Sequence, residues 1–296
     1  VILSRGELVE IGGDFRIPDV MIQSGAQLDE VGTTNRTKLA DYERAISPAT
    51  TMLMRVHPSN FRLVGFTATP ELRDLAQLAH QHGLILYEDA GSGALIDLTK
   101  LGVEGEPMIA DSVAAGTDVV TFSGDKLLGG VQAGFIVGRK DLIEKVRRHP
   151  LYRALRPDKT ALAAVEATLL IYRRGAAIEE IPALAMINAE PSLIGVRALA
   201  LAQALSENER TTGLTVELTP GESAIGGGAA PTTHPPTMLI AISHATLSAD
   251  DLAAALRRHD PPVIARINEG RVVLDLRTVS VDEEPELLSA LRQIGI

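Results

Sequence analysis

Three short apolar runs in the first half of the chain each end in a polar loop. The runs span residues 51–56, 84–87 and 118–122, and amphipathic stretches of helical length separate them. Strands that alternate with helices in this way are typical of βαβ units, which build a mostly parallel sheet. Open α/β sheets bind ligands just beyond the carboxyl ends of their strands. We therefore predict an α/β domain whose ligand site lies where the three polar loops meet.

Composition and periodicity divide the chain into three predicted parts. Residues 1–157 form the α/β domain, residues 158–208 are linking helices, and residues 209–296 are a small α+β domain. In the third part a stretch rich in glycine and proline, residues 221–236, comes before the regular elements. We expect the order strand, helix, strand, strand, helix, at residues 239–242, 250–258, 263–267, 271–276 and 284–294.

The composition excludes several functional classes. Cysteine is absent, which rules out disulfides, cysteine metal ligands and thiol nucleophiles. Aromatic residues make up only 3% of the chain, which argues against stacking platforms for sugars or single-stranded nucleic acid. The net charge of −10 repels phosphate backbones, so an RNA contact needs a local patch or another segment. No apolar run reaches the ~20 residues of a membrane span and no signal-peptide pattern opens this sequence, so we predict a cytoplasmic protein without membrane contact.

Residues at the three strand ends meet the demands of pyridoxal 5′-phosphate (PLP) chemistry. PLP needs an amine for a Schiff base, a carboxylate beside its pyridine nitrogen, and donors for its phenolic oxygen and its phosphate. Lys126 stands in a glycine-containing loop after the third run, and Asp89 follows the second run. Asn60 follows the first run and is a candidate donor to the phenolic oxygen, while Ser123 is a candidate donor to the phosphate. The order of these four residues at successive strand ends predicts a PLP-dependent enzyme.

Each of the four residues also has a purely structural interpretation. A lysine in a glycine-rich turn is usually a surface residue. Asp89 alone fits a helix cap or a turn, Ser123 fits a cap on the following segment, and Asn60 fits the closure of its own loop. The combination of the four favours the cofactor site over these separate explanations.

The segment Ser-Gly-Asp-Lys-Leu-Leu-Gly-Gly-Val-Gln-Ala-Gly at residues 123–134 resembles the cofactor-lysine motif of the bacterial selenocysteine synthases, the L-seryl-tRNA(Sec) selenium transferases. Further similarity at residues 16–21, 30–37, 56–61 and 151–159 extends the resemblance over nearly the whole chain. It implies the aspartate aminotransferase (type I) fold of PLP-dependent transferases, with helices on both faces of a mostly parallel sheet. It also implies the family's reaction, in which serine esterified on tRNA(Sec) loses water to give an aminoacrylyl intermediate and selenophosphate supplies the selenium.

The resemblance also implies roles for individual residues. It makes Lys126 the Schiff-base lysine and catalytic base, and Asp125 a neighbour that activity requires. Arg153 and Arg156 fall where the family keeps arginines that bind the anionic selenium donor. Guanidinium groups match phosphate oxygens in a bidentate way, and we expect the two arginines to share one face of a helix. Without the resemblance, a solvated basic turn is the simpler interpretation.

Two departures from the family pattern have consequences. Val131 replaces a usual proline, which alters the stiffness of the loop more than its chemistry. The family's N-terminal tRNA-binding domain, its phosphate-cup residues and a further active-site arginine are not found, and the chain starts without Met and then runs into a strand-like segment at residues 7–11. We therefore expect a chain that lacks its N-terminal part, binds tRNA poorly and holds PLP weakly.

Two other motifs do not define a site. His80 and His82 are two positions apart on a predicted helix and so point to different faces, and we assign no metal site. The glycines 226–228 lack the lysine that completes a P-loop. They are compatible with a loop that approaches the active site and equally with a flexible connection.

Three functions remain open from the sequence. The leading hypothesis is a selenium transferase with PLP as cofactor and with seryl-tRNA(Sec) and selenophosphate as partners. A related PLP-dependent lyase acting on a small phosphorylated amino-sugar acid would use the same Lys126 and Asp89, with Arg153 and Arg156 holding the substrate phosphate. A catalytically idle fragment would serve only in assembly. For either enzyme we expect a homo-oligomer with its active site at a subunit interface.

Overall fold

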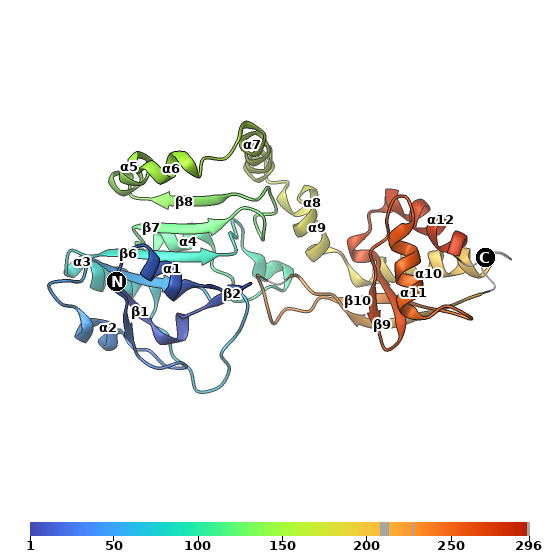
Figure 1. The fold of residues 1–296 in the computed structure, drawn as a ribbon, viewed down its shortest axis with the longest axis horizontal. Helices are drawn as coiled ribbons and strands as arrows, with labels where there is room; N and C mark the ends of the chain where they lie inside the picture. Colours follow the sequence, from blue (N-terminus) through green and yellow to red (C-terminus); the bar gives the residue numbers. More distant parts are fainter. Residues whose placement is uncertain (208–212, 227, 295–296) are drawn as a thin grey trace. The chain divides into compact units, whose positions relative to one another are not determined.

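The computed structural model describes residues 1–207, 213–226 and 228–294. The chain divides into two compact units (Figure 1). The larger unit comprises Val1–Leu184 with Ile225–Thr233, and the smaller unit comprises Ala185–Ala224 with His234–Ile296. The domain boundaries after residues 157 and 208 stay a prediction.

The larger unit is built on a six-stranded sheet with the strand order β4-β1-β5-β6-β7-β8. Neighbouring strands are parallel except β7 and β8, which are antiparallel. The three apolar runs form β5, β6 and β7 side by side, so the predicted mostly parallel sheet is confirmed. The strands are β1 (Ile2–Ser4), β4 (Asp29–Val31), β5 (Met52–Val56), β6 (Ile85–Gly91), β7 (Val119–Ser123) and β8 (Gly134–Gly138).

Helices cover both faces of this sheet. Ile2 and Leu53 pack into one core with α2 and α3, while the next residues along the same strands, Leu3 and Met54, pack into a second core with α1. Successive strand residues point to opposite faces, so both faces of a sheet with helices on each side must be apolar. The helices of this unit are α1 (Ile17–Gln23), α2 (Leu39–Ala45), α3 (Leu72–Gln81), η2 (Leu98–Leu101), α4 (Ile109–Ala114), α5 (Lys140–Arg148), α6 (Pro150–Ala154), α7 (Lys159–Arg173) and α8 (Ala177–Glu180).

The segment that follows β1 differs from the prediction of a strand at residues 7–11. The chain first makes the 3-10 turn η1 (Arg5–Glu7), and only then β2 (Glu10–Gly12), which pairs with β3 (Phe15–Arg16) in a separate hairpin. The physical reason is the long-range ion pair between Glu7 and Arg55 of β5, which draws the Glu7 side chain into the interior. The alternation of apolar and polar residues at 7–11 does not reveal that interaction.

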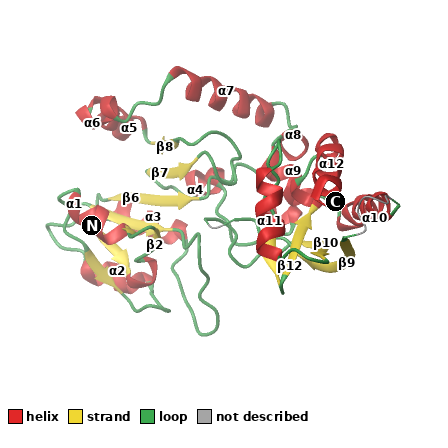
Figure 2. Ribbon diagram, turned by 45° about the vertical axis from the view of Figure 1, so that its right-hand side comes forward, coloured by secondary structure: helices red, strands yellow, loops and turns green. Residues whose placement is uncertain are grey.

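The smaller unit has a four-stranded antiparallel sheet with the order β11-β12-β10-β9, and α10, α11 and α12 pack on it in one apolar core (Figure 2). Each element predicted after residue 236 overlaps an observed one. The strand β9 was not predicted because Pro220 and Gly221 lie within it, and its position at the edge of the sheet explains how proline is tolerated. The elements are α9 (Pro182–Asn188), α10 (Pro191–Ser206), β9 (Leu214–Glu222), β10 (Pro236–His244), α11 (Ala249–Arg258), β11 (Arg266–Asn268), β12 (Arg271–Asp275), η4 (Leu276–Thr278), η5 (Val281–Glu283) and α12 (Glu284–Ile294).

The described residues contain neither a single helix suited to cross a membrane nor a cluster of metal-ligating side chains. No single helix there is long and apolar enough to cross a membrane, and only the bent pair α9 and α10, taken together, meets that test of length and composition. In the same part of the chain no three histidine, aspartate or glutamate side chains gather in a group that could hold a metal ion.

Candidate active site

The carboxyl ends of β5, β6 and β7 bring Asp89 next to residues of both neighbouring strands. Asp89 lies near the end of β6, where its carbonyl oxygen accepts a hydrogen bond from the backbone N–H of His57 at 2.9 Å. On the other side, Thr121 Oγ1 of β7 donates to Asp89 Oδ1 at 3.3 Å. The second predicted strand is longer than expected, so Asp89 is part of β6 and not of a following loop.

The environment of Asp89 suits a carboxylate that binds a cation. Burial raises the pKa of Asp89 above its usual value, whereas the Thr121 hydroxyl, the Gly91 N–H and the positive charge of Lys126 act in the opposite direction. A half-buried carboxylate of this kind is stabilised when a positively charged N–H donor is placed against it.

Lys126 stands in a loop whose backbone is fixed from several directions. The N–H of Leu127 donates to Ser92 O at 3.0 Å, and the hydroxyl of Tyr172 on α7 donates to Leu128 O at 2.9 Å. Gly129 has φ +72°, and a Cβ there would lie 2.3 Å from Cγ2 of Ile181. The loop therefore requires glycine at position 129, and its constraints hold the lysine near the sheet edge.

The glycine-rich segment approaches this lysine. A Cβ built on Gly228 would lie 3.0 Å from Cε and 3.3 Å from Nζ of Lys126. Of the two arrangements that the sequence allowed for glycines 226–228, the structure therefore has the one beside the candidate active site. Gly227 lies outside the described residues.

A cavity of about 1030 Å³ opens along the carboxyl ends of β6 and β7. Asp89, Thr121 and Ser123 line its polar side, so the structure brings two of the predicted cofactor residues to one cavity. Side chains of β8 and of α5 to α7 line the rest of it. These include Phe135, Ile136, Ile143, Val146, Leu151, Leu155, Leu162 and Val165.

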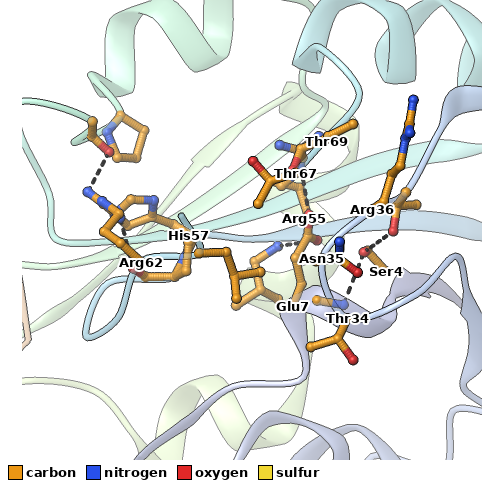
Figure 3. A pocket seen from close by; sticks show the side chains of 18 of the residues that line it. Ser4, Glu7, Thr34, Asn35, Arg36, Arg55, His57, Arg62, Thr67 and Thr69 are labelled. Carbon is orange, nitrogen blue, oxygen red and sulfur yellow. Dashed lines mark hydrogen bonds and ion pairs between the residues drawn. The ribbon is translucent and has the colours of Figure 1, made fainter. Parts of the chain in front are cut away.

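A second cavity, of about 470 Å³, lies at the carboxyl ends of β1, β4 and β5 (Figure 3). It is lined by three arginines, Arg36, Arg55 and Arg62, and by three glutamates, Glu7, Glu88 and Glu106. Most of these charges are paired within the cavity wall.

Among the carboxyl groups of this second cavity, Glu7 has a strongly raised pKa. Glu7 Oε1 lies 3.1 Å from Arg55 Nε, and the other carboxylate oxygen accepts the Val56 N–H at 3.1 Å. Burial nevertheless raises the pKa of Glu7 to about 7, with the Arg55 charge and the Val56 N–H opposing the shift and the Glu88 charge adding to it.

His57 and Glu106 form a contact that the sequence analysis did not predict. His57 Nε2 lies 3.2 Å from Oε2 of Glu106, whose side chain is only 1% exposed. Burial works to raise the pKa of Glu106, but His57, the Ser92 hydroxyl and the backbone N–H of Ala230 together outweigh it and leave the pKa below its usual value. Because the ionised carboxylate can only accept, His57 Nε2 is the donor. His57 directly follows β5, a position at which the sequence could have marked it, whereas no local signal marks Glu106.

Four other predicted residues do not lie with Asp89 and Ser123 in the cavity at the carboxyl ends of β6 and β7. The side chain of Asn60 donates to Glu10 O of the β2–β3 hairpin at 2.8 Å, and Asn60 lines neither cavity. Asp125 is exposed. Arg153 and Arg156 are also exposed, and the prediction that they share one helical face is wrong because α6 ends at Ala154. The proline at position 157 disfavours helical backbone at Arg156.

Comparison with known proteins decides the family. The profile described as SelA, L-seryl-tRNA selenium transferase, matches residues 1–280. The chain belongs to this family. It is 48% identical over 296 residues to the L-seryl-tRNA(Sec) selenium transferase of Geobacter sulfurreducens and 50% identical over 293 residues to that of Moorella thermoacetica. These matches cover 100% and 99% of this chain, which spans only 64% and 62% of the two relatives.

A solved structure described as D-glucosaminate-6-phosphate ammonia-lyase has the same fold. It superposes with a TM-score of 0.59 at 23% sequence identity, covering 99% of this chain and 70% of the other. The expected type I fold of PLP-dependent transferases is confirmed. Membership of the selenium transferase family implies PLP as the cofactor, in agreement with the prediction from the strand ends.

The residues at the sheet edge fit PLP by their chemistry. Asp89 is a half-buried carboxylate whose raised pKa a protonated ring nitrogen would counteract. Lys126 supplies the amine, and the hydroxyls of Thr121 and Ser123 open into the same cavity as Asp89. An amine, a carboxylate and hydroxyl donors are the groups that PLP enzymes use to hold the cofactor.

Proposed function

We propose that this chain carries the catalytic core of an L-seryl-tRNA(Sec) selenium transferase, which converts serine on its tRNA to selenocysteine with selenophosphate. PLP, when bound, supplies an electron sink for the serine carbon that loses its proton. The observation that carries the proposal is that Asp89 and Ser123 line one cavity at the carboxyl ends of β6 and β7, with Lys126 three residues after Ser123, in a chain of this family.

Four of the chain's own residues would hold the cofactor. The Lys126 amine would hold the cofactor covalently and would serve as the catalytic base. Asp89 would favour a positive charge on the ring nitrogen, Ser123 would donate to the phosphate, and Asn60 would donate to the phenolic oxygen. For that last role Asn60 would have to release its present bond to Glu10, which makes it the least supported of the four.

Arg153 and Arg156 would bind the selenium donor, and Asp125 would assist Lys126. All three side chains are exposed, and the two arginines are therefore open to an incoming anion. A guanidinium group can bind a phosphate-like anion through two parallel charged hydrogen bonds. The seryl-tRNA(Sec) partner is supported by the names of the relatives, and the net charge of −10 favours tRNA contacts made outside this chain.

We further propose a cytoplasmic homo-oligomer with its active site at a subunit interface. Helix α7 has no buried residue and exposes Leu162, Leu169 and Leu170. An apolar helical face of this kind is stabilised when another surface covers it.

The cofactor assignment is tested with the purified chain and added PLP. The wild type should show the visible absorbance of lysine-bound PLP, Lys126→Ala should lose it, and the exposed Lys100→Ala should keep it. A correctly folded wild type without that absorbance refutes the assignment.

The reaction is tested in a protein of the relatives' full length that contains this chain. Arg153→Ala and Arg156→Ala should each raise the selenophosphate concentration needed for half-maximal selenocysteinyl-tRNA formation by roughly tenfold, the loss of about one charged hydrogen bond. Saturation at the wild-type concentration would remove the arginines from the donor site. Activity only on a small phosphorylated amino-sugar acid would replace the proposed function by a lyase.

A further inference from the structure

The segment Ile225–Thr233 belongs to the larger unit although the residues before and after it belong to the smaller one. Ala229 and Ala230 of this segment are 4% and 3% exposed. A stretch rich in glycine and proline normally runs over the surface. Burial of these two residues means that the segment is packed in a defined place within the larger unit.

The segment is fixed by one long-range hydrogen bond. The backbone N–H of Ala230 donates to Glu106 Oε1 at 2.6 Å across a separation of 124 residues. The other carboxylate oxygen of Glu106 accepts from His57 Nε2, and Arg62 Nη2 lies 3.5 Å from Oε1. Bonds to an ionised acceptor are shorter and stronger than bonds between neutral groups, so Glu106 is a firm anchor for Ala230.

Two residues before this anchor, Gly228 lies against the side chain of Lys126. A Cβ on Gly228 would lie 3.0 Å from Cε and 3.3 Å from Nζ of Lys126, closer than an ordinary van der Waals contact, so the lysine side chain would have to shift by a few tenths of an ångström. The φ of Gly228 is not in the left-handed region, so a larger residue would disturb this contact and not the backbone conformation.

We propose that Glu106 is a positioning residue for Lys126: through Ala230 it holds the backbone of Gly228 against the lysine and so restricts where the ammonium group sits. The consequence for PLP binding rests on the proposed function, in which Lys126 carries the cofactor. Glu106 does not line the cavity of about 1030 Å³ that Asp89 and Ser123 share, so the proposed role is one of positioning and not of contact with a ligand there.

Chemical labelling of Lys126 tests the restriction without any cofactor. The chain without PLP is treated with an amine-acylating reagent, and the labelling rate of Lys126 is measured by peptide mass spectrometry relative to the exposed Lys100 in the same sample. In Glu106→Ala the ratio should rise about tenfold, as expected for the loss of a charged hydrogen bond. Hydrogen exchange at Ala230 should rise with it.

Two variants separate positioning from general destabilisation. Glu106→Gln keeps an oxygen that accepts the Ala230 N–H, so its labelling ratio should stay within about twofold of wild type. The exposed Glu104→Ala, two residues away, should leave the ratio unchanged. A wild-type ratio in folded Glu106→Ala, or an equal rise in Glu106→Gln, overturns the proposal.

Gly228→Ala provides the test if Glu106→Ala does not fold. Its Cβ can be accommodated only if the lysine side chain shifts, so the labelling ratio should change and PLP affinity should fall about tenfold. An unchanged ratio in Gly228→Ala overturns the proposal. If labelling responds as expected in a chain that never binds PLP, the proposed function fails and the positioning role stands. If PLP binds to Lys126 but labelling is the same in every variant, the positioning role alone fails.

Discussion

Replacing Glu7 by Gln should change how the stability of the larger unit depends on pH. Glu7 is buried at the end of η1, paired with Arg55 and bonded to the Val56 N–H. Burial raises its pKa from 4.5 to about 7 in spite of these partners. In the unfolded chain the same carboxyl group is solvated and titrates near its ordinary value.

The sign and size of the effect follow from that difference. Between pH 4.5 and about 7 the folded chain holds a proton on Glu7 that the unfolded chain has released. The free energy of unfolding therefore falls as the pH rises through this window. Above the window, the titration of Glu7 causes no further change in the free energy of unfolding. At about 1.4 kcal/mol per pKa unit the fall is about 3 kcal/mol. Glu7→Gln does not titrate, so this contribution disappears.

Urea unfolding measures the effect, with hydrogen exchange at the β5 amides reporting on the larger unit alone. The measured quantity is the free energy of unfolding of Glu7→Gln minus that of wild type. This difference should rise by about 3 kcal/mol between pH about 4.5 and pH about 7.5. Glu43→Gln, on the exposed side of α2, controls for the loss of one carboxylate from the net charge. If Glu7→Gln and Glu43→Gln show the same pH dependence, the burial argument for Glu7 is refuted.

Three further substitutions test other contacts. Tyr172→Phe removes the donor to Leu128 O and should lower the free energy of unfolding by about 1 kcal/mol and weaken PLP binding; a stability loss with unchanged PLP affinity would show that the bond does not position the lysine loop. Gly129→Ala should leave little folded protein at 37 °C, since φ is +72° and the new Cβ would lie 2.3 Å from Ile181 Cγ2, and normal expression with a normal melting temperature would contradict this. Arg277→Met should destabilise the smaller unit by roughly 3–5 kcal/mol in thermal unfolding because the buried guanidinium bonds to four backbone carbonyls; a change below about 1 kcal/mol would refute this.

The sheet and the order of the residues at its edge could be predicted from the sequence. The runs that became β5, β6 and β7 are apolar over consecutive residues because both of their faces are covered, and that pattern is visible without a structure. Asp89, Ser123 and Lys126 follow from where those runs end. The PLP assignment needed only the chemistry of these residues and the rule that ligands bind at strand carboxyl ends.

Contacts between distant parts of the chain could not be predicted in this way. Asn60 was placed at the cofactor by its position after β5, yet its amide bonds to Glu10 of a hairpin that the local pattern did not reveal. Glu106 looks like an ordinary loop glutamate until His57 and Ala230 are brought to it, 49 and 124 residues away. Periodicity reports which residues are buried, but it carries no information on which distant partner buries them.

The bond between Glu106 and Ala230 also has a consequence for how the protein is made. Gly228 is synthesised 228 − 126 = 102 residues after Lys126, which at about 5–20 residues per second is a delay of roughly 5–20 s. During that interval the strands of the large sheet can already pair on the ribosome while the lysine still lacks the backbone that lies against it. The order of the sequence therefore makes this contact of the lysine a late event of synthesis, and a nascent chain that stops before residue 228 would present Lys126 without it.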